Sequence, residues 1–189
     1  MATTPLIPAQ IEPLFQAVTA LAVGATLPNG GPDPDQVRLE WQTESQPEAP
    51  LSKTVTYLRC VEEDDQYNRV RDSLTGAASQ GNAPQVNTYI RVWRVYWCFY
   101  GPGSFDNARK MRSALLMDQG THDALMTANL ALVTDMRAPL RVPERWSGGQ
   151  WRERVDFEAA FNELVTEVPI VPVVNGLEVI IEVADHSQA

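Results

Sequence analysis

The strongest pattern in the sequence is residues 88–100, which read Thr-Tyr-Ile-Arg-Val-Trp-Arg-Val-Tyr-Trp-Cys-Phe-Tyr. Aromatic and β-branched side chains of this kind favour strands. Because they occupy both alternating faces of the run, the pattern predicts a central strand covered on both sides. Such a strand cannot be stable alone, so the rest of the chain must supply neighbouring strands and covering helices.

Several other segments show strand patterns. Val37, Leu39 and Trp41 alternate with polar residues, and residues 53–62 follow as a second strand, so the pair is expected to form a long hairpin or arm. From Trp151 to Phe161 the alternation is regular and predicts a strand with one solvated face. Two shorter strands are expected at residues 131–137 and 177–183, with a loop or hairpin turn at 138–150.

Three segments show helical periodicity. Apolar residues from Ile11 to Ala22 recur every three or four positions, which predicts a helix over residues 9–24 ending at Gly24. Ser104 is expected to cap a helix that runs to about Asp118, and Thr121 a shorter one to about Leu130.

Together these elements predict one α+β domain over residues 1–189, with a mostly antiparallel sheet of four to six strands packed against two or three helices. The proline-rich residues 27–52 and the polar residues 63–87 are expected to be long loops or an arm. A connection as long as 63–87 is unusual inside a compact domain, so we expect both segments to contact neighbouring subunits.

The charge of the chain is unevenly distributed. The net charge is −9 overall, but residues 67–141 carry +4 while residues 1–66 and 142–189 carry −7 and −6. An acidic chain is a poor general binder of nucleic acid. The segregation suits a protein whose opposite faces meet copies or partners, although an ordinary solvated surface would look similar.

No targeting or membrane signal is apparent. Residues 1–8 contain no basic side chain, so a secretory signal is not expected. The apolar stretch at residues 14–25 is too short for a bilayer core of roughly 30 Å. The sequence therefore predicts a protein made in the cytoplasm that does not contact a membrane.

Residue types that often form catalytic or metal sites are sparse. The two histidines, His122 and His186, lie in no recognisable catalytic motif. Cys60 and Cys98 are far apart in sequence and form no C-x-x-C pair, so we expect buried free thiols and no zinc site. We predict no catalytic, cofactor-binding or metal-binding residue and no cofactor.

Two further motifs have ordinary structural explanations. The acidic run at residues 62–65 lacks the spacing of a calcium loop and is expected to be a solvated strand end. The Gly101-Pro102-Gly103 sequence lies between a strand and a helix but lacks the lysine of a phosphate-binding loop, so it is expected to be a tight turn.

Two alternatives with a ligand stay open on sequence grounds. Basic and aromatic side chains interleave in the central strand and could stack single-stranded nucleic acid: Arg91, Trp93, Arg94 and Trp97. A hydrolase that uses a pair of carboxylates is also possible on residue types, because the chain has 24 acidic residues.

Two stretches carry a resemblance to a known family. Residues 89–108 join an aromatic strand to a Tyr-Gly-Pro turn and a helix, and residues 141–157 read Arg-Val-Pro-Glu-Arg-Trp-Ser-Gly-Gly-Gln-Trp-Arg-Glu-Arg-Val-Asp-Phe. Both resemble the neck or tail-terminator proteins of tailed phages, and residues 68–72 are a third point of similarity. The resemblance extends over residues 68–184, and the proline-rich residues 27–50 have no counterpart in it.

The resemblance implies a fold and a role. Proteins of this kind are small α+β domains that assemble as a hexameric ring at the head–tail junction, end tail-tube growth and dock onto the head connector. It therefore implies a virion structural protein, with no enzymatic activity, whose partners are its own copies, the tail tube protein and the connector or stopper. DNA would pass through the lumen without specific binding. Another head–tail completion or tail-tube component is the nearest alternative.

Overall fold

The computed structural model describes residues 5–40, 52–63, 72–77, 82–145 and 149–172. It confirms the α+β class. The helices are α1 (Pro8–Val23), α2 (Ser104–Met117) and α3 (Gln119–Thr127). The described strands number eight, more than the four to six expected: β1 (Val37–Leu39), β2 (Val55–Glu63), β3 (Asp72–Thr75), β4 (Asn82–Tyr100), β5 (Leu130–Leu132), β6 (Leu140–Arg145), β7 (Trp151–Glu167) and β8 (Ile170–Pro172).

All eight strands belong to one open sheet built around β4. The main strand order is β1-β2-β4-β7-β5, with β3 and β8 also paired to β4 and β6 paired to β7. Every pairing is antiparallel except that of β1 with β2. In register, β8 continues β7 along β4, because Tyr100 faces Arg154 and Asn82 faces Pro172 with no shift between them.

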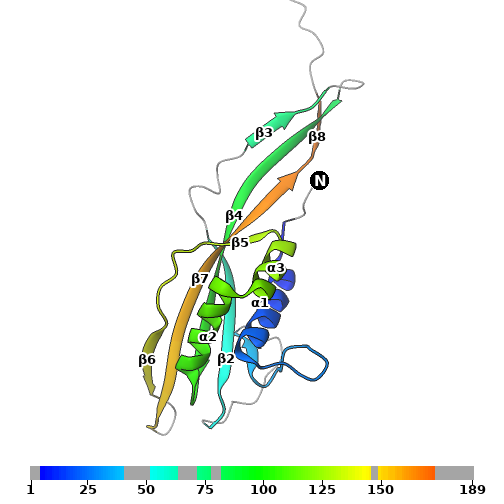
Figure 1. The fold of residues 1–189 in the computed structure, drawn as a ribbon. Coiled ribbons are helices and arrows are strands. Elements are labelled where there is room, and N and C mark those ends of the chain that lie inside the picture. Colours follow the sequence, from blue (N-terminus) through cyan, green and yellow to red (C-terminus); the bar gives the residue numbers. More distant parts are fainter. Residues whose placement is uncertain (1–4, 41–51, 64–71, 78–81, 146–148, 173–189) are drawn as a thin grey trace, which may run out of the picture.

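The long β4–β7–β8 ribbon divides the molecule into two parts (Figure 1). In the body, the second half of β4 is flanked by β2 and β7, and the helices lie against one face. Beyond the body, the ribbon continues as a strand-only projection with no helix beside it. We call this projection the arm: β3, β8, residues 82–90 of β4 and residues 164–167 of β7.

The core lies between the helices and the inner face of the body sheet. Phe15 of α1 packs 4.6 Å from the ring of Phe161 and 6.2 Å from that of Trp97, all fully buried. The Trp97 Nε1–H donates a 2.8 Å hydrogen bond to Thr19 Oγ1, which in turn donates to the carbonyl of Phe15. This chain fixes α1 on β4 and satisfies the buried indole, whose isolated N–H would otherwise be costly.

The expectation that β4 is covered on both faces is wrong. Trp93, Val95, Trp97 and Phe99 are buried toward the helices, but the alternate residues Arg94, Tyr96, Cys98 and Tyr100 are only half-buried on the other face. The physical reason is that tyrosine combines an apolar ring with a polar tip, and arginines of neighbouring strands cover these rings without a second layer. Arg59 lies 4.8 Å from the Tyr96 ring and Arg152 lies 4.7 Å from that of Tyr100.

Pairing and strand lengths differ from the sequence expectations in three places. Strand β1 pairs with β2 in parallel, Val37 facing Thr56, so the two are not a hairpin. The strand expected at 131–137 spans only Leu130–Leu132. The segment 138–150, expected to be a loop or hairpin turn, contains β6, which pairs antiparallel with β7. Trp41 and the strand expected at 177–183 lie outside the described residues.

The polar segment 63–87 is not a loop in its described part, because residues 72–75 form β3 and residues 82–87 begin β4. Strand pairing satisfies the backbone whatever the side chains are, so polar residues give little sequence signal for it. In the segment 27–52, the described part forms a turn closed by the Thr26–Pro32 bridge and then β1. The role of both segments in subunit contacts stays a prediction.

One helix end lies where the sequence predicted it, and two N-cap residues differ from the prediction. Gly24 ends α1 as expected, with φ 77° and its N–H bonded to the carbonyls of Ala20 and Leu21. However, Gly103 and not Ser104 is the N-cap of α2, and Asp118 and not Thr121 caps α3 by accepting a 2.7 Å bond from the Thr121 N–H. In the described part of the chain, no helix is both long and apolar enough to cross a bilayer.

Candidate assembly surfaces

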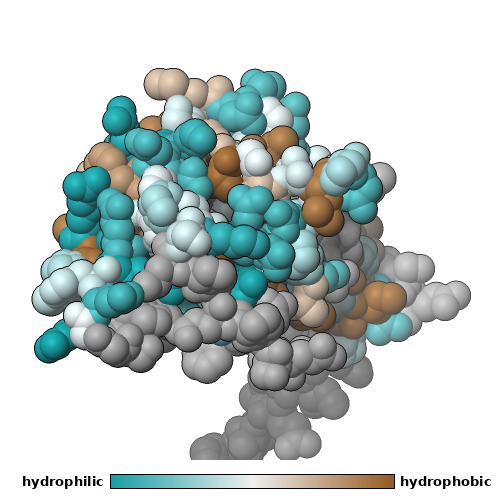
Figure 2. Space-filling view, turned by 90° about the horizontal axis from the view of Figure 1, so that it is seen from below, coloured by the Kyte–Doolittle hydropathy of each residue, from teal (hydrophilic) through white to brown (hydrophobic). Residues whose placement is uncertain are grey.

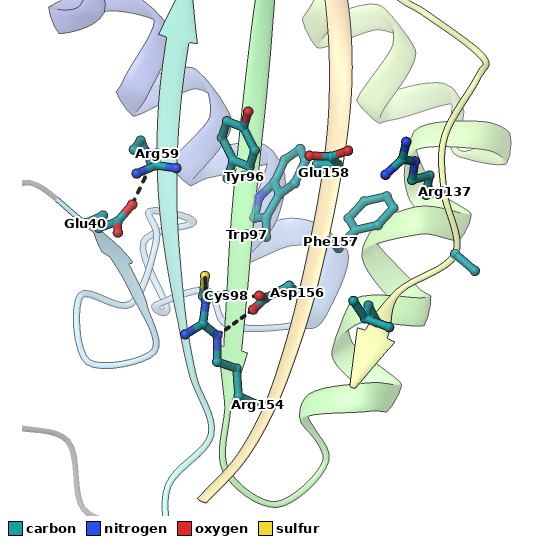
Figure 3. Close-up of a pocket in the computed structure, with 12 residues that line it drawn as sticks. Glu40, Arg59, Tyr96, Trp97, Cys98, Arg137, Arg154, Asp156, Phe157 and Glu158 are labelled. Carbon is teal, nitrogen blue, oxygen red and sulfur yellow. Dashed lines mark hydrogen bonds and ion pairs between the residues drawn. The ribbon is translucent and has the colours of Figure 1, made fainter. Parts of the chain in front are cut away.

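The sheet face turned away from the helices, which we call the open face, carries a shallow hollow on the body. Figure 3 shows it from this side, and its volume is about 430 Å³. Charged and aromatic side chains of β2, β4, β7 and their flanks line it. These include Arg59, Tyr96, Arg154, Asp156, Glu158 and Arg137.

Ion pairs connect the strands across the open face. Arg59 lies 3.4 Å from the Glu40 carboxylate, and Arg154 Nε donates a 2.7 Å bond to Asp156. Arg94 hydrogen-bonds Glu63 on β2 and lies 3.5 Å from Glu158 on β7, so it links three strands. The hydrogen bond that Arg154 donates to Asp156 raises the pKa of Arg154, and burial raises the pKa of Tyr100. Arg59, Arg94 and Arg154 are therefore each paired with a carboxylate on the open face.

This geometry does not favour a carboxylate-pair hydrolase. Such an enzyme needs one carboxyl group whose pKa is raised, so that it can act as an acid. Glu40, Asp156 and Glu158 at the hollow are each ion-paired with an arginine, at 3.4, 2.7 and 3.5 Å. Where a carboxyl pKa in the described structure departs from its usual value, it is lowered: at Asp33, Glu62 and Asp118, chiefly by hydrogen bonds.

The nucleic-acid stacking hypothesis is wrong for the residues that suggested it. Trp93 and Trp97 are 2% and 0% exposed and lie in the core, so no base can reach their rings. Their indole N–H groups are taken by Glu163 and Thr19. Arg91 pairs with Glu62 and Glu163, and Arg94 with Glu63 and Glu158.

The remaining candidate residues are dispersed. A ring nitrogen of His122 lies 2.9 Å from the Leu115 carbonyl, and His186 lies outside the described residues. Cys60 and Cys98 are free and half-buried. No cluster of three or more His, Cys, Asp or Glu suited to a metal ion occurs within the described ranges. Glu62 and Glu63 end β2, each bonded to an arginine.

Both thiols are expected to be unreactive in the folded protein. Burial is the main cause that raises the pKa of Cys60 to about 12 and that of Cys98 to about 11. At pH 8 their thiolate fractions are then at least ~100-fold below that of an ordinary cysteine with a pKa near 8.5. Because a thiolate of higher pKa is also more nucleophilic, part of this difference is offset, and a chromogenic disulfide reagent should label the native protein at least ~10-fold more slowly than unfolded protein. Rapid labelling of native protein would contradict this assignment of burial.

A buried carboxylate lies in the body, next to the point where the arm begins. Glu163 of β7 is 2% exposed; its Oε1 accepts a 2.7 Å bond from the Leu6 N–H and its Oε2 accepts one of 2.7 Å from Trp93 Nε1. Arg91 lies 3.4 Å from the same carboxylate, donates to the Leu6 carbonyl and also binds Glu62. Sequence reasoning missed Glu163, although its parity with Phe161 and Val165 was a signal that it points inward.

The arm exposes apolar side chains on one face. Directly opposed residues of antiparallel strands share a face, and the pairs Leu74–Val86, Ile90–Leu164 and Pro84–Ile170 lie on the same one. Leu74, Leu164 and Ile170 are 73%, 52% and 74% exposed. The other face is mostly polar, with residues such as Ser73, Gln85, Asn87 and Glu167. We call the apolar side the arm face: Leu74, Pro84, Val86, Ile90, Leu164 and Ile170.

The end of the body opposite the arm has a different character. Seen from there, the coloured residues are mostly hydrophilic, with small separate hydrophobic patches (Figure 2). A ribbon with an exposed apolar face is typical of a surface that binds another protein.

Comparison with known families decides the identity of the chain. A model of the phage neck terminator protein family matches residues 10–186. The chain belongs to this family. No curated protein matches it significantly. The match confirms the resemblance seen in residues 68–184 and extends it to α1 and to residues 27–50, for which the sequence offered no counterpart.

Membership of the neck terminator family gives the coarse function. The protein is a structural component of a phage head–tail assembly and part of the virion, and it assembles with other head–tail proteins. Surfaces that bind other proteins are therefore the functional sites to expect, and the arm face and the open face are two candidates in the described structure.

Proposed function

We propose that this protein forms a ring, as a hexamer of its own copies, which terminates the tail tube and joins it to the head connector or stopper. The observation that carries the proposal is the arm, whose apolar face has no covering layer among the described residues, on a chain of the neck terminator family. A few exposed strands are marginal in isolation and gain stability when another surface covers them. In a ring, a neighbouring subunit would supply the surface that covers the arm.

The charge of the chain supports the passage of DNA through such a ring. The net charge of −9 disfavours tight binding of phosphates, which would retard a moving duplex. We propose that DNA passes through the lumen without specific binding, that the protein is made in the host cytoplasm, and that it performs no catalysis. The paired carboxylates of the open face agree with a scaffold role.

The proposal is tested by deletion of the gene from the phage. Without the protein, electron microscopy should show filled heads and separate tails with abnormal tube ends, and joined particles should be lost. Expression in trans should restore them. Complete absence of tail tubes would instead indicate a tube protein, and normal particle yield would contradict any role at the junction.

A further inference from the structure

One edge of the arm carries no paired strand in the described part of the chain. Strand β8 and residues 165–167 of β7 pair with β4 on one side, and none of the described strands lies on their other side. The unpaired N–H and C=O groups of such an edge are a template for another strand. The edge can therefore accept a further strand.

A single hydrogen bond fixes which backbone groups point to this edge. The Gln85 N–H donates a 2.9 Å bond to the Pro169 carbonyl, so the backbone of Pro169 bonds toward β4. Because the bonding direction alternates along a strand, Ile170 and Pro172 differ: Ile170 and every second residue after it direct their polar groups to the free edge. Pro172 offers only its carbonyl there, since proline has no N–H.

The sequence that follows β8 carries the signals of a hairpin. Residues 173–189 continue directly from the end of β8 on the arm. Asn175-Gly176 is the dipeptide most typical of a two-residue turn between strands. In residues 177–183 every odd-numbered residue is apolar and two of the three even-numbered residues are glutamate, the alternation of a strand.

A two-residue turn fits the free edge in register. Such a turn is closed by a hydrogen bond between its two flanking residues, here Val174 and Leu177. Position 174 lies four residues after Ile170, so its backbone also points away from β4, as the turn requires. Counting back four residues from Val174 and forward four from Leu177 places Ile181 opposite Ile170.

The side chains agree with the same register. Opposed residues of antiparallel strands share a face, so the odd-numbered apolar residues of 177–183 fall on the arm face beside Ile170, which is 74% exposed. Glu178 and Glu182 fall on the other face, which is mostly polar. A slip of one residue would place the glutamates beside Ile170 and reverse the match.

We propose that residues 177–183 turn back at Asn175-Gly176 and pair antiparallel with β8 and the end of β7 of the same chain. The arm gains one strand, and its apolar face extends past Ile170 onto that strand. The added strand also occupies an edge that could otherwise recruit strands from other chains. A partner of the arm would then bind its face and not this edge. The inference does not depend on the proposed ring.

A cysteine pair tests the register in the full-length protein. Val171 would face Ile180 in a pair without hydrogen bonds, with Cα atoms about 4.5 Å apart, which a disulfide can span. In a glutathione buffer, V171C/I180C should form an intramolecular disulfide at least ~10-fold more favourably than V171C/I181C, whose second cysteine lies on the opposite face. Peptide mass mapping distinguishes this bond from any bond to Cys60 or Cys98.

Amide hydrogen exchange of dilute wild-type protein is an independent readout. The N–H groups of Val179 and Ile181 would bond to carbonyls of β8, whereas that of Ile180 would point outward. The first two should exchange at least ~10-fold more slowly than the third. Equal exchange at all three positions, or equal disulfide formation in the two cysteine variants, would overturn the inference.

The remaining outcomes separate this pairing from its alternatives. A V171C/I180C disulfide between two chains would show that a neighbouring copy supplies the strand, which overturns pairing within one chain. A protein that closes the V171C/I180C disulfide internally but never forms a ring, alone or on tail tubes, would contradict the proposed function and leave this inference intact.

Discussion

Replacement of Glu163 by alanine should lower the free energy of unfolding by about 3–5 kcal/mol, because it leaves two donors without an acceptor and removes one of the two carboxylates beside Arg91. The Glu163 carboxylate accepts from the Leu6 N–H and from Trp93 Nε1 and lies 3.4 Å from Arg91. Without it, the Trp93 indole loses its acceptor in the core, and the chain before α1 loses its attachment to β7. Urea unfolding followed by tryptophan fluorescence measures the loss.

Two control variants isolate the cause. Glu153 pairs with Arg141 at 3.2 Å, but its side chain is 41% exposed, so E153A should cost less than about 1 kcal/mol. E163Q keeps an acceptor of the same shape and should recover part of the stability of E163A. An E163A protein as stable as wild type would show that Glu163 is not buried among these partners.

Replacement of Gly101 by alanine should lower the free energy of unfolding by an amount comparable to that of E163A. Gly101 lies in the turn between β4 and α2, and its N–H bonds to the Glu153 carbonyl. A Cβ there would lie 2.3 Å from the Lys53 carbonyl oxygen, and the φ of +90° disfavours any side chain. Because the obstacle is the backbone of Lys53, the segment just before β2 must move. We therefore expect the free energy of unfolding to fall by about 3 kcal/mol or more.

Gly103 is a matched control in the same turn. Its φ is +82°, but a Cβ would meet nothing within 4 Å. G103A should therefore cost only the left-handed backbone penalty of about 1–2 kcal/mol. Thermal unfolding of both variants measures the difference. Equal melting temperatures for G101A and G103A would contradict the close approach of Lys53 to Gly101.

The sequence predicted well those elements whose fold is set by local apolar patterns. Helix α1 was expected at residues 9–24 and is found at Pro8–Val23, because its apolar stripe and Gly24 are strong local signals. The alternation after Trp151 also predicted β7 correctly. The aromatic run of β4 predicted a central strand, but its two-sided cover was wrong, since composition does not show that arginines on other strands cover the tyrosines.

The arm and the Glu163 cluster depend on contacts between distant residues. The polar start of β4 gives almost no strand signal, and only pairing with β3, β7 and β8 reveals that Leu74, Leu164 and Ile170 share one face. Likewise, the partners of Glu163 include Leu6, which is 157 positions away in sequence. Such pairings follow from topology and not from a local period, so one sequence could not supply them.

High-resolution imaging of the neck of the assembled virion tests the role of this protein most directly. We predict a closed ring of its copies between the end of the tail tube and the head connector, with α1, α2 and the sheet recognisable in each subunit. Density for the neck that accommodates no copy of this fold, or a location of the protein elsewhere in the particle, would contradict that role.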